Sequence, residues 1–230
     1  RRNALVRWNR KGRSPQTIAA NLDLAVCVTS PLSPPFRPRF LDRLLLACGR
    51  EGIPAVICLN KIDQGAGPET EERLEDFVSR GVRVLRTSVT ENTGLESLRQ
   101  TISGKRAVFV GQSGVGKTSI LNSLMPGRDR RVGKISEKYN RGCHTTVLAH
   151  LEEWDDGELI DTPGVREFEL YGITADELRF LFEEFASPAE KGAYPRCTHR
   201  HEPACAVKRA AESGEILQDR YESYLRIRDV

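Results

Sequence analysis

Several features of membrane and secreted proteins are missing from this chain of 230 residues. No apolar run approaches the roughly 18 residues that a membrane-spanning helix needs, and no secretory leader is recognisable. The six cysteines are too scattered for a dense disulfide framework. A cytoplasmic location without membrane contact is therefore expected. The first residue is Arg1 rather than a methionine, which favours a fragment of a longer protein.

A large net charge is also missing, because 35 basic residues nearly balance 32 acidic ones. The basic residues are nevertheless unevenly placed. Residues 1–13 hold six of them and no acidic residue, and residues 128–141 hold six with two acidic residues. Such stretches can contact the phosphate backbone of a nucleic acid or form an ordinary solvated surface. The sequence leaves both interpretations open.

Short apolar stretches alternate with segments of helical periodicity through most of the chain. Strands are predicted at residues 22–30, 54–60, 82–89, 106–111, 145–154 and 157–164. Helices are predicted at residues 39–52, 68–81, 95–102 and 118–125. This alternation predicts an α/β fold with a largely parallel sheet.

The pattern changes after Tyr171. An amphipathic helix is predicted over 174–185, with Thr174 as its N-terminal cap. Residues 186–207 are rich in cysteine and histidine and are interpreted as a loop, and residues 215–230 as a final helix. These segments predict a separate helical domain.

A glycine-rich stretch lies between a predicted strand and a predicted helix. Its sequence, GQSGVGKTS, matches the phosphate-loop pattern G-x-x-x-x-G-K-[ST], and the strand–loop–helix context supports the match. Backbone N–H groups of such a loop surround phosphate oxygens. Lys117 is expected to reach the β and γ phosphates and to act in catalysis, and the Thr118 hydroxyl to bind Mg²⁺. The residues expected to contact the nucleotide are Gly111, Gln112, Ser113, Gly114, Val115, Gly116, Lys117, Thr118 and Ser119.

A second motif, D-T-P-G, begins at Asp161 after a predicted strand. An aspartate at this place can hold Mg²⁺ through water, and the Gly164 N–H can sense the γ phosphate. Between the two motifs, Thr145 or Thr146 is expected to complete the Mg²⁺ shell, and Thr145 is the favoured candidate. The alternatives are an ordinary turn and two β-branched residues that begin a strand.

The string N-K-x-D, formed by Asn60, Lys61 and Asp63, is a guanine-reading pattern. The Asp63 carboxylate is expected to accept from two N–H groups of guanine that adenine does not offer, which opposes an ATPase. Asn60 and Lys61 are expected to brace the loop and flank the base. After the next predicted strand, Ser88 and the N–H group of Val89 are expected to contact the guanine oxygen.

The order of these motifs is unusual, because the guanine reader precedes the phosphate loop. That order indicates a circular permutation, which a parallel sheet tolerates when the chain ends lie close together. The strings NKID, GQSGVGKTS, RGCHTT, DTPG and CTHRHEPACAV resemble the circularly permuted ribosome-small-subunit-dependent GTPase A family (RsgA, also called YjeQ or YloQ). The resemblance extends from about Ile18 onward. It implies the tail of an N-terminal OB-fold over 1–17, a permuted GTPase domain over 18–170 and a C-terminal helical zinc-binding-type domain over 171–230.

The resemblance also implies a function. Members of this family bind GTP and GDP with Mg²⁺, contact rRNA and act in late maturation of the small ribosomal subunit. They hydrolyse GTP slowly alone and faster with the subunit. A monomer is expected. The alternatives are a permuted GTPase that acts on another ribosomal particle, and a GTP-gated RNA-binding module with negligible catalysis.

One catalytic residue of Ras-like GTPases is missing. Val165 stands directly after D-x-x-G, where those enzymes carry a water-orienting glutamine. The catalytic group must therefore come from elsewhere in the chain or from the partner. The resemblance makes His144, beside the two threonines, the candidate, and a surface-loop histidine is the alternative.

A metal ligand of the family is missing as well. Cys197, His199 and Cys205 are three soft ligands within nine residues, a set that suits tetrahedral Zn²⁺. The family has a further cysteine where this chain has Gly192. The alternatives are a site completed by water or another side chain, and a metal-free loop.

Overall fold

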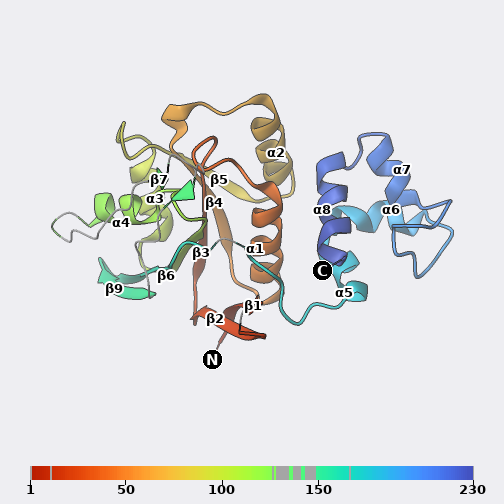
Figure 1. Cartoon of the computed structure of the whole chain (residues 1–230), viewed down its shortest axis with the longest axis horizontal. Helices are drawn as coiled ribbons and strands as arrows, with labels where there is room; N and C mark the ends of the chain where they lie inside the picture. The colour runs from red at the N-terminus through yellow and green to blue at the C-terminus, as the bar shows by residue number, and fades with distance from the viewer. Residues whose placement is uncertain are drawn as a thin grey trace. The chain divides into compact units, whose positions relative to one another are not determined.

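The computed structural model of the chain describes residues 2–10, 12–125, 127, 135–136, 141–142, 149–165 and 167–229. It divides into two compact units, Arg1–Glu169 and Leu170–Val230 (Figure 1). Within the described ranges, no helix combines the length and the apolar composition that crossing a bilayer requires.

A six-stranded sheet forms the centre of the first unit, in the order β5-β4-β3-β6-β10-β9. Its pairs are parallel except for β9, which runs antiparallel to β10 at one edge. All six residues of β3 are buried, as a central strand covered on both faces requires. The predicted α/β fold with a largely parallel sheet is confirmed. The strands are β3 (Leu24–Thr29), β4 (Ala55–Asn60), β5 (Arg83–Thr87), β6 (Arg106–Gly111), β9 (His150–Trp154) and β10 (Gly157–Asp161).

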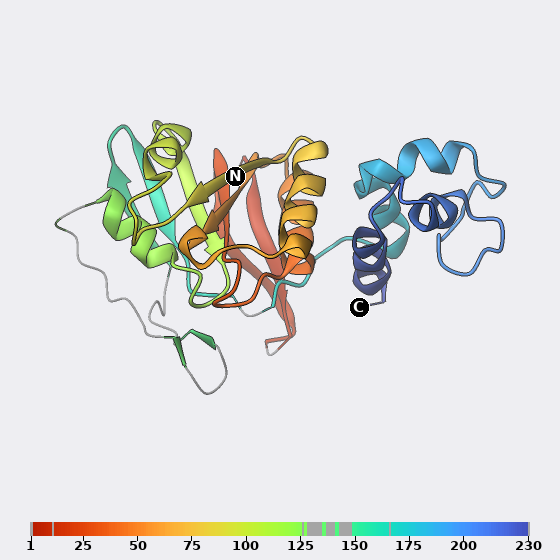
Figure 2. The same ribbon diagram turned by 90° about the horizontal axis from the view of Figure 1, so that it is seen from above.

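Helices cover both faces of this sheet (Figure 2). Two of them, α1 (Pro38–Arg50) and α2 (Pro68–Ser79), lie on one face, and α3 (Leu95–Ile102) and α4 (Lys117–Leu124) lie on the other. A proline begins both α1 and α2, where its fixed φ suits the first helical turn. The core against α3 and α4 is apolar and closely packed, and its buried side chains include Leu98, Ile102, Phe109, Ile120 and Leu121.

The order of the strands reverses between β3 and β6. Strands β4 and β5 add to one side of β3, and the chain then returns to place β6 on its other side. Because α1 and α4 cover opposite faces, the loops that follow β3 and β6 leave the sheet in opposite directions. In open α/β sheets, such a switch point leaves a crevice at the carboxyl ends of the strands, where ligands bind.

Two small antiparallel pairs lie outside the central sheet. One joins β1 (Ala4–Asn9) to β2 (Ser14–Ala20), and the other joins β7 (Ile135–Ser136) to β8 (Arg141–Gly142). Strands β1 and β2 were not predicted, since the first residues of β2 are exposed and its pairing with β1 defines it. The hairpin is fixed to the end of the same unit, since the Trp8 N–H donates to the Glu169 carbonyl at 3.0 Å.

The second unit consists of short helices around aromatic side chains. The Phe185 ring lies 5.0 Å from that of Tyr224, and the Phe182 ring 5.2 Å from it, measured between centroids. The elements are α5 (Ala175–Leu181), the 3₁₀ turn η2 (Glu183–Phe185), α6 (Ala186–Glu190), α7 (Ala206–Glu212) and α8 (Gln218–Arg228).

Two predictions about this unit were wrong, and two are confirmed, one of them the final helix, which is α8. The single helix over 174–185 is broken at Phe182, whose φ and ψ of −95° and 84° leave the helical region, so that Phe182 and Phe185 both pack on Tyr224. The loop predicted over 186–207 contains α6 and the start of α7. The Thr174 cap is confirmed, because its hydroxyl accepts from the Glu177 N–H at 3.2 Å.

Candidate functional site

The predicted phosphate loop turns between β6 and α4 at the switch point of the sheet. Two of its glycines leave no space for a side chain. A Cβ at Gly111 would lie 2.2 Å from the Val28 carbonyl oxygen, and a Cβ at Gly116 would lie 2.3 Å from the Asn60 amide nitrogen. Gly116 also has a φ of +96°, which disfavours other residues. The glycines thus allow the loop to pack directly against β3 and β4.

Lys117, the first residue of α4, is buried inside this loop. Its ammonium group donates to the carbonyl oxygens of Gly111 and Gln112 at 3.0 and 3.1 Å. Burial lowers the pKa of Lys117 to about 8, although the nearby Asp161 carboxylate opposes this shift. A second negative group at this place would strengthen the charged form of the lysine.

The D-T-P-G string lies directly against the phosphate loop. Asp161 ends β10, and its carboxylate accepts from the Thr118 hydroxyl at 3.3 Å. A Cβ at Gly164 would lie 2.5 Å from the Ser113 Cα atom. The next residue, Val165, is buried, and its N–H donates to the Gly111 carbonyl at 3.1 Å. Carboxylate and hydroxyl oxygens are ligands that suit Mg²⁺, so this donor set fits the ion.

The N-K-x-D string meets the phosphate loop from the other side. Asn60 ends β4 and donates from its side chain to the Val115 carbonyl at 2.9 Å. The Lys61 ammonium donates at 2.7 Å to the Gly114 carbonyl, and at the same distance to the carbonyl of Ser33. Two motifs that are separated by more than fifty positions in the sequence are therefore joined by direct hydrogen bonds.

Asp63 and Ser88 follow neighbouring strands and meet at the edge of this site. The Ser88 hydroxyl donates to the Asp63 carboxylate at 2.5 Å. Asn60 also accepts from the Thr87 hydroxyl at 3.1 Å, which ties the end of β5 to the end of β4. Val89 packs at the border of the apolar core. The residues predicted to contact guanine are thus brought together at one place.

Some predicted residues cannot be placed, and others were missed. His144, Thr145 and Thr146 lie outside the described residues. The loop after β3, residues 30–37, was not predicted to contribute, and it also reaches the site through Ser33 and Arg37. Its only sequence signal is its place after a buried strand, and that signal becomes informative once the strand order is known.

A cluster of two cysteines and one histidine lies in the second unit. The ligand atoms of Cys197, His199 and Cys205 all lie within 4.8 Å of one another, and all three residues are buried. The Nδ1 atom of His199 is 3.4 Å from the sulfur of Cys205. Burial raises the pKa of the Cys197 thiol to about 12 and lowers the pKa of His199. Two sulfurs and one imidazole nitrogen are a donor set that fits zinc.

The backbone around this cluster is firmly held. The hydroxyl groups of Tyr221 and Tyr224 donate to the carbonyls of His199 and Thr198 at 2.7 and 2.8 Å. The Glu202 carboxylate accepts from the Thr198 N–H at 2.7 Å. Among the described residues the group has three members, and the exposed His201 is not one of them. The position of the missing family ligand, Gly192, remains without a donor side chain.

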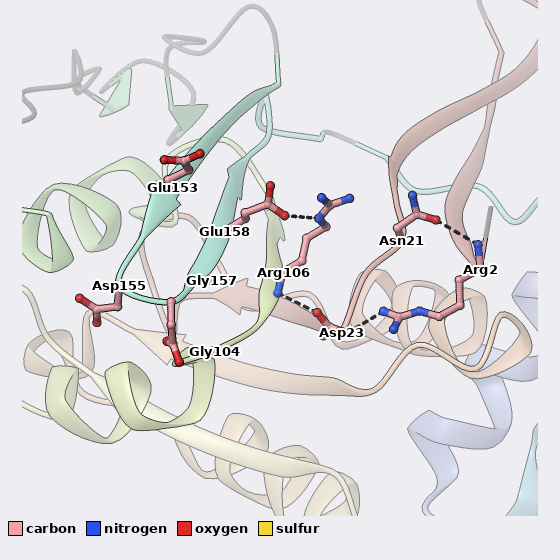
Figure 3. Close-up of a pocket in the computed structure, with 10 residues that line it drawn as sticks. Arg2, Asn21, Asp23, Gly104, Arg106, Glu153, Asp155, Gly157 and Glu158 are labelled. Carbon is pink, nitrogen blue, oxygen red and sulfur yellow. Dashed lines mark hydrogen bonds and ion pairs between the residues drawn. The ribbon is translucent and has the colours of Figure 1, made fainter.

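A cavity of about 760 Å³ lies at the opposite end of the central sheet (Figure 3). Most of its lining side chains are charged, and several pair with one another. Arg106 pairs with Glu158, and Arg2 pairs with Asp23 at 2.6 Å. No described residue of the predicted site lines this cavity. The cavity is therefore separate from the phosphate loop and the guanine reader.

Comparison with protein families identifies one matching family model. The model of the RsgA GTPase family matches residues 1–171. A protein named small ribosomal subunit biogenesis GTPase RsgA, from Borreliella burgdorferi (strain ZS7), is 37% identical over 227 residues, which cover 99% of this chain and 74% of that protein. The protein of the same name from Chlorobaculum parvum is 40% identical over 225 residues, covering 97% of this chain and 72% of its own length.

Two solved structures resemble the chain over most of its length. YjeQ from Thermotoga maritima superimposes with a TM-score of 0.72 and 28% identity, covering 95% of this chain and 79% of its own. YloQ, described as a circularly permuted GTPase, superimposes with a TM-score of 0.67 and 32% identity, covering 99% of this chain and 72% of its own.

Proposed function

The chain belongs to the RsgA GTPase family, and we propose that it hydrolyses GTP in late maturation of the small ribosomal subunit. In this proposal, hydrolysis is slow in the free protein, and contact with the subunit and its rRNA stimulates it. The protein then acts in the cytoplasm as a monomer. A sedimentation measurement that found a stable dimer would contradict the last point.

The observation that carries the proposal is the direct bonding between the guanine reader and the phosphate loop. Asn60 and Lys61 hold the carbonyls of Val115 and Gly114 at 2.9 and 2.7 Å. In this proposal, a nucleotide with its phosphates on residues 111–119 would have its base beside residues 60–63. Asp63 and Ser88 are already adjacent there, and a carboxylate at this place selects guanine.

The phosphate end of the proposed site contains the groups that the chemistry requires. Lys117 is placed to neutralise charge on the phosphates, because its ammonium group is already held inside the loop. Thr118 and Asp161 would hold Mg²⁺, and Thr145 from the segment outside the described residues would complete its shell. The bound ion would neutralise the charge that develops on the phosphates during transfer.

Single-turnover GTP hydrolysis, measured with and without purified small subunits, tests this function. We expect slow hydrolysis by the free protein and a clear increase with small subunits, and no increase with large subunits. Stimulation by large subunits alone would favour a permuted GTPase of another ribosomal particle. Binding of GTP with no hydrolysis under any condition would favour a GTP-gated RNA-binding module.

Guanine selection by Asp63 has a separate test. Asparagine at this position offers an N–H donor where guanine also donates, so Asp63→Asn should shift the preference from GTP to xanthosine triphosphate. Competition binding with the two nucleotides measures this shift. A variant that kept its preference for GTP would show that another residue reads the base.

We also propose that His144 orients the attacking water, since buried Val165 cannot do so by hydrogen bonding. A neutral imidazole can perform this task when the geometry places it correctly. The His144→Ala variant should bind GTP normally and lose most of the subunit-stimulated turnover. Stimulated turnover at the native rate would rule out this role.

The Cys/His cluster is proposed to bind Zn²⁺ through Cys197, His199 and Cys205, which already converge. Water or a side chain outside the described residues would then supply the fourth ligand. Metal analysis of protein purified without chelators should give about one zinc per chain, and Cys205→Ser should lose it. Zinc far below one per chain in the native protein would favour a metal-free loop.

A further inference from the structure

The loop after β3, residues 30–37 (the β3–α1 loop), crosses the switch point of the sheet and is firmly braced. The Ser33 carbonyl accepts from the Lys61 ammonium at 2.7 Å, and the Ser33 N–H donates to the Gln64 side chain at 3.0 Å. Within the loop, the buried Ser30 hydroxyl donates to the Pro34 carbonyl at 2.8 Å. The segment that contains the guanine reader thus fixes the path of this loop.

Arg37 ends the β3–α1 loop and directs its side chain to the phosphate loop. It directly precedes α1 but makes no side-chain hydrogen bond that caps this helix. With the Gln112 amide oriented so that its oxygen faces the guanidinium, Nε and Nη1 of Arg37 donate to that oxygen at 3.1 and 3.3 Å. Gln112 is buried and Arg37 is exposed, so the guanidinium supplies a donor to this amide oxygen from the surface. A charged donor makes the stronger kind of hydrogen bond.

The two ends of the phosphate loop therefore have different supports. Asn60 and Lys61 hold the carbonyls at positions 114 and 115. Arg37 holds position 112, in the end that meets the D-T-P-G segment. There, the Val165 N–H donates to the Gly111 carbonyl at 3.1 Å. Gly164 packs so closely on Ser113 that a Cβ at position 164 would lie 2.5 Å from the Ser113 Cα atom.

We propose that Arg37 is a positioning residue for GTP hydrolysis. By holding the Gln112 side chain, it keeps residues 111–113 in register with the D-T-P-G segment, the part of the site that meets the γ phosphate. It has little effect on the base and the β phosphate, because the other end of the loop has its own support. This inference rests on the proposed nucleotide site.

The test measures GDP affinity and GTP turnover in the same variants. Arg37→Ala should leave the Kd for GDP within about twofold of the native value and lower kcat by about 10- to 100-fold, as small misplacements in a reactive geometry do. Gln112→Ala removes the same contact and should lower kcat to a similar degree. The double variant should be no slower than the slower single variant, because both changes remove one interaction. Arg50→Ala, at the far end of the same helix, is the matched charge-loss control.

Several outcomes would overturn the proposal. They are native turnover in Arg37→Ala, an equal loss of GDP affinity and turnover, and effects of the two single variants that multiply in the double variant. Arg37→Lys, which keeps one donor and the charge, should recover part of the turnover, and no recovery would count against positioning. A GTP analogue gives a readout without catalysis, since Arg37→Ala should weaken its binding more than that of GDP. If the native chain fails to hydrolyse GTP, the proposed function is contradicted. The ratio of the affinity for the GTP analogue to the affinity for GDP, compared between Arg37→Ala and the native chain, still decides the role of Arg37.

Discussion

At the carboxyl end of the central sheet, Asn60 and Lys117 donate hydrogen bonds to backbone carbonyls of the phosphate loop. At the amino end of the same sheet, Arg106 pairs with the Glu158 carboxylate beside the charged cavity. Asn60 and Lys117 are 1% and 6% exposed, whereas the side chains of Arg106 and Glu158 are 31% and 29% exposed. Polar side chains lie at both ends of the sheet, but those compared at the carboxyl end are buried and those at the amino end are partly exposed.

This difference separates a preformed site from a charged surface. A buried donor that holds a backbone carbonyl fixes the shape of a loop, because losing the bond leaves a buried polar group unsatisfied. A partly exposed ion pair is replaced by water at little cost. The carboxyl end is therefore expected to respond strongly to single substitutions, and the amino end weakly.

Replacing a buried lysine at the carboxyl end should have the largest effect. Lys117→Ala removes the ammonium group that we propose neutralises the phosphates, and we expect kcat/KM for GTP to fall by about 10²–10³-fold. Lys105→Ala is the matched control, because Lys105 lies just before β6 at the amino end and donates to the Thr101 carbonyl at 2.6 Å. The control should keep its activity within about twofold. Equal losses in the two variants would remove the contrast between the ends.

The lowered pKa of Lys117 predicts a pH dependence of stability without nucleotide. The folded state holds this proton with a pKa of about 8, against 10.5 for the unfolded chain. Between these values the unfolded state binds more protons, so the free energy of unfolding should rise with pH. Across this pH range, the shifted pKa of Lys117 changes the free energy of unfolding by on the order of 3 kcal/mol. Urea unfolding at pH 8 and 10.5 should show this rise in the free energy of unfolding of the native protein. In Lys117→Met, the part of the rise that Lys117 contributes should be absent.

Removing Asn60 should destabilise the fold. Asn60→Ala leaves the Val115 carbonyl without its donor and leaves the Thr87 hydroxyl with the Cys58 sulfur at 3.4 Å, at a cost of about 1–3 kcal/mol in the free energy of unfolding. Asn21→Gly is the control at the amino end, where the exposed Asn21 accepts from the Arg2 N–H and has a φ of +57° that glycine tolerates. Chemical denaturation measures both variants. The contrast fails if Asn21→Gly is as destabilising as Asn60→Ala.

Breaking the ion pair at the amino end should have the smallest effect. Arg106→Gln removes the pairing with Glu158, and we expect a loss below about 1 kcal/mol in the free energy of unfolding. The loss should shrink further as salt is added, because ions screen charges near the surface. Unfolding at low and high salt measures it. A loss of several kcal/mol that is independent of salt would show that this end is as tightly organised as the other.

The motifs of the nucleotide site were predictable because each depends on local spacing. The glycines and Lys117 of the phosphate loop form a short string, and a buried strand on one side with a helix on the other is visible as a pattern of apolar residues. The interaction of Arg37 with Gln112 was not predictable in this way. Its two partners are far apart in the chain, and although Gln112 lies within the phosphate-loop string, nothing in the local sequence marks Arg37.

The second unit shows the same limit for secondary structure. Helical periodicity continues through 174–185, yet the chain breaks at Phe182 because two phenylalanines pack on Tyr224. The predicted loop over 186–207 contains short helices. The gain from packing these rings exceeds the small preference of a few residues for continuing a helix.

The α/β fold, the motifs and their permuted order can be read from the amino-acid sequence, because strand and helix periods and short functional strings are local properties. The tertiary structure alone decided which of those strings touch. It joins the guanine reader to the phosphate loop, because β3, β4 and β6 are neighbours in the sheet. It also brings Arg37 to Gln112, because the loops after β3 and β6 meet at the switch point. Such contacts depend on the order of strands, which no local pattern specifies.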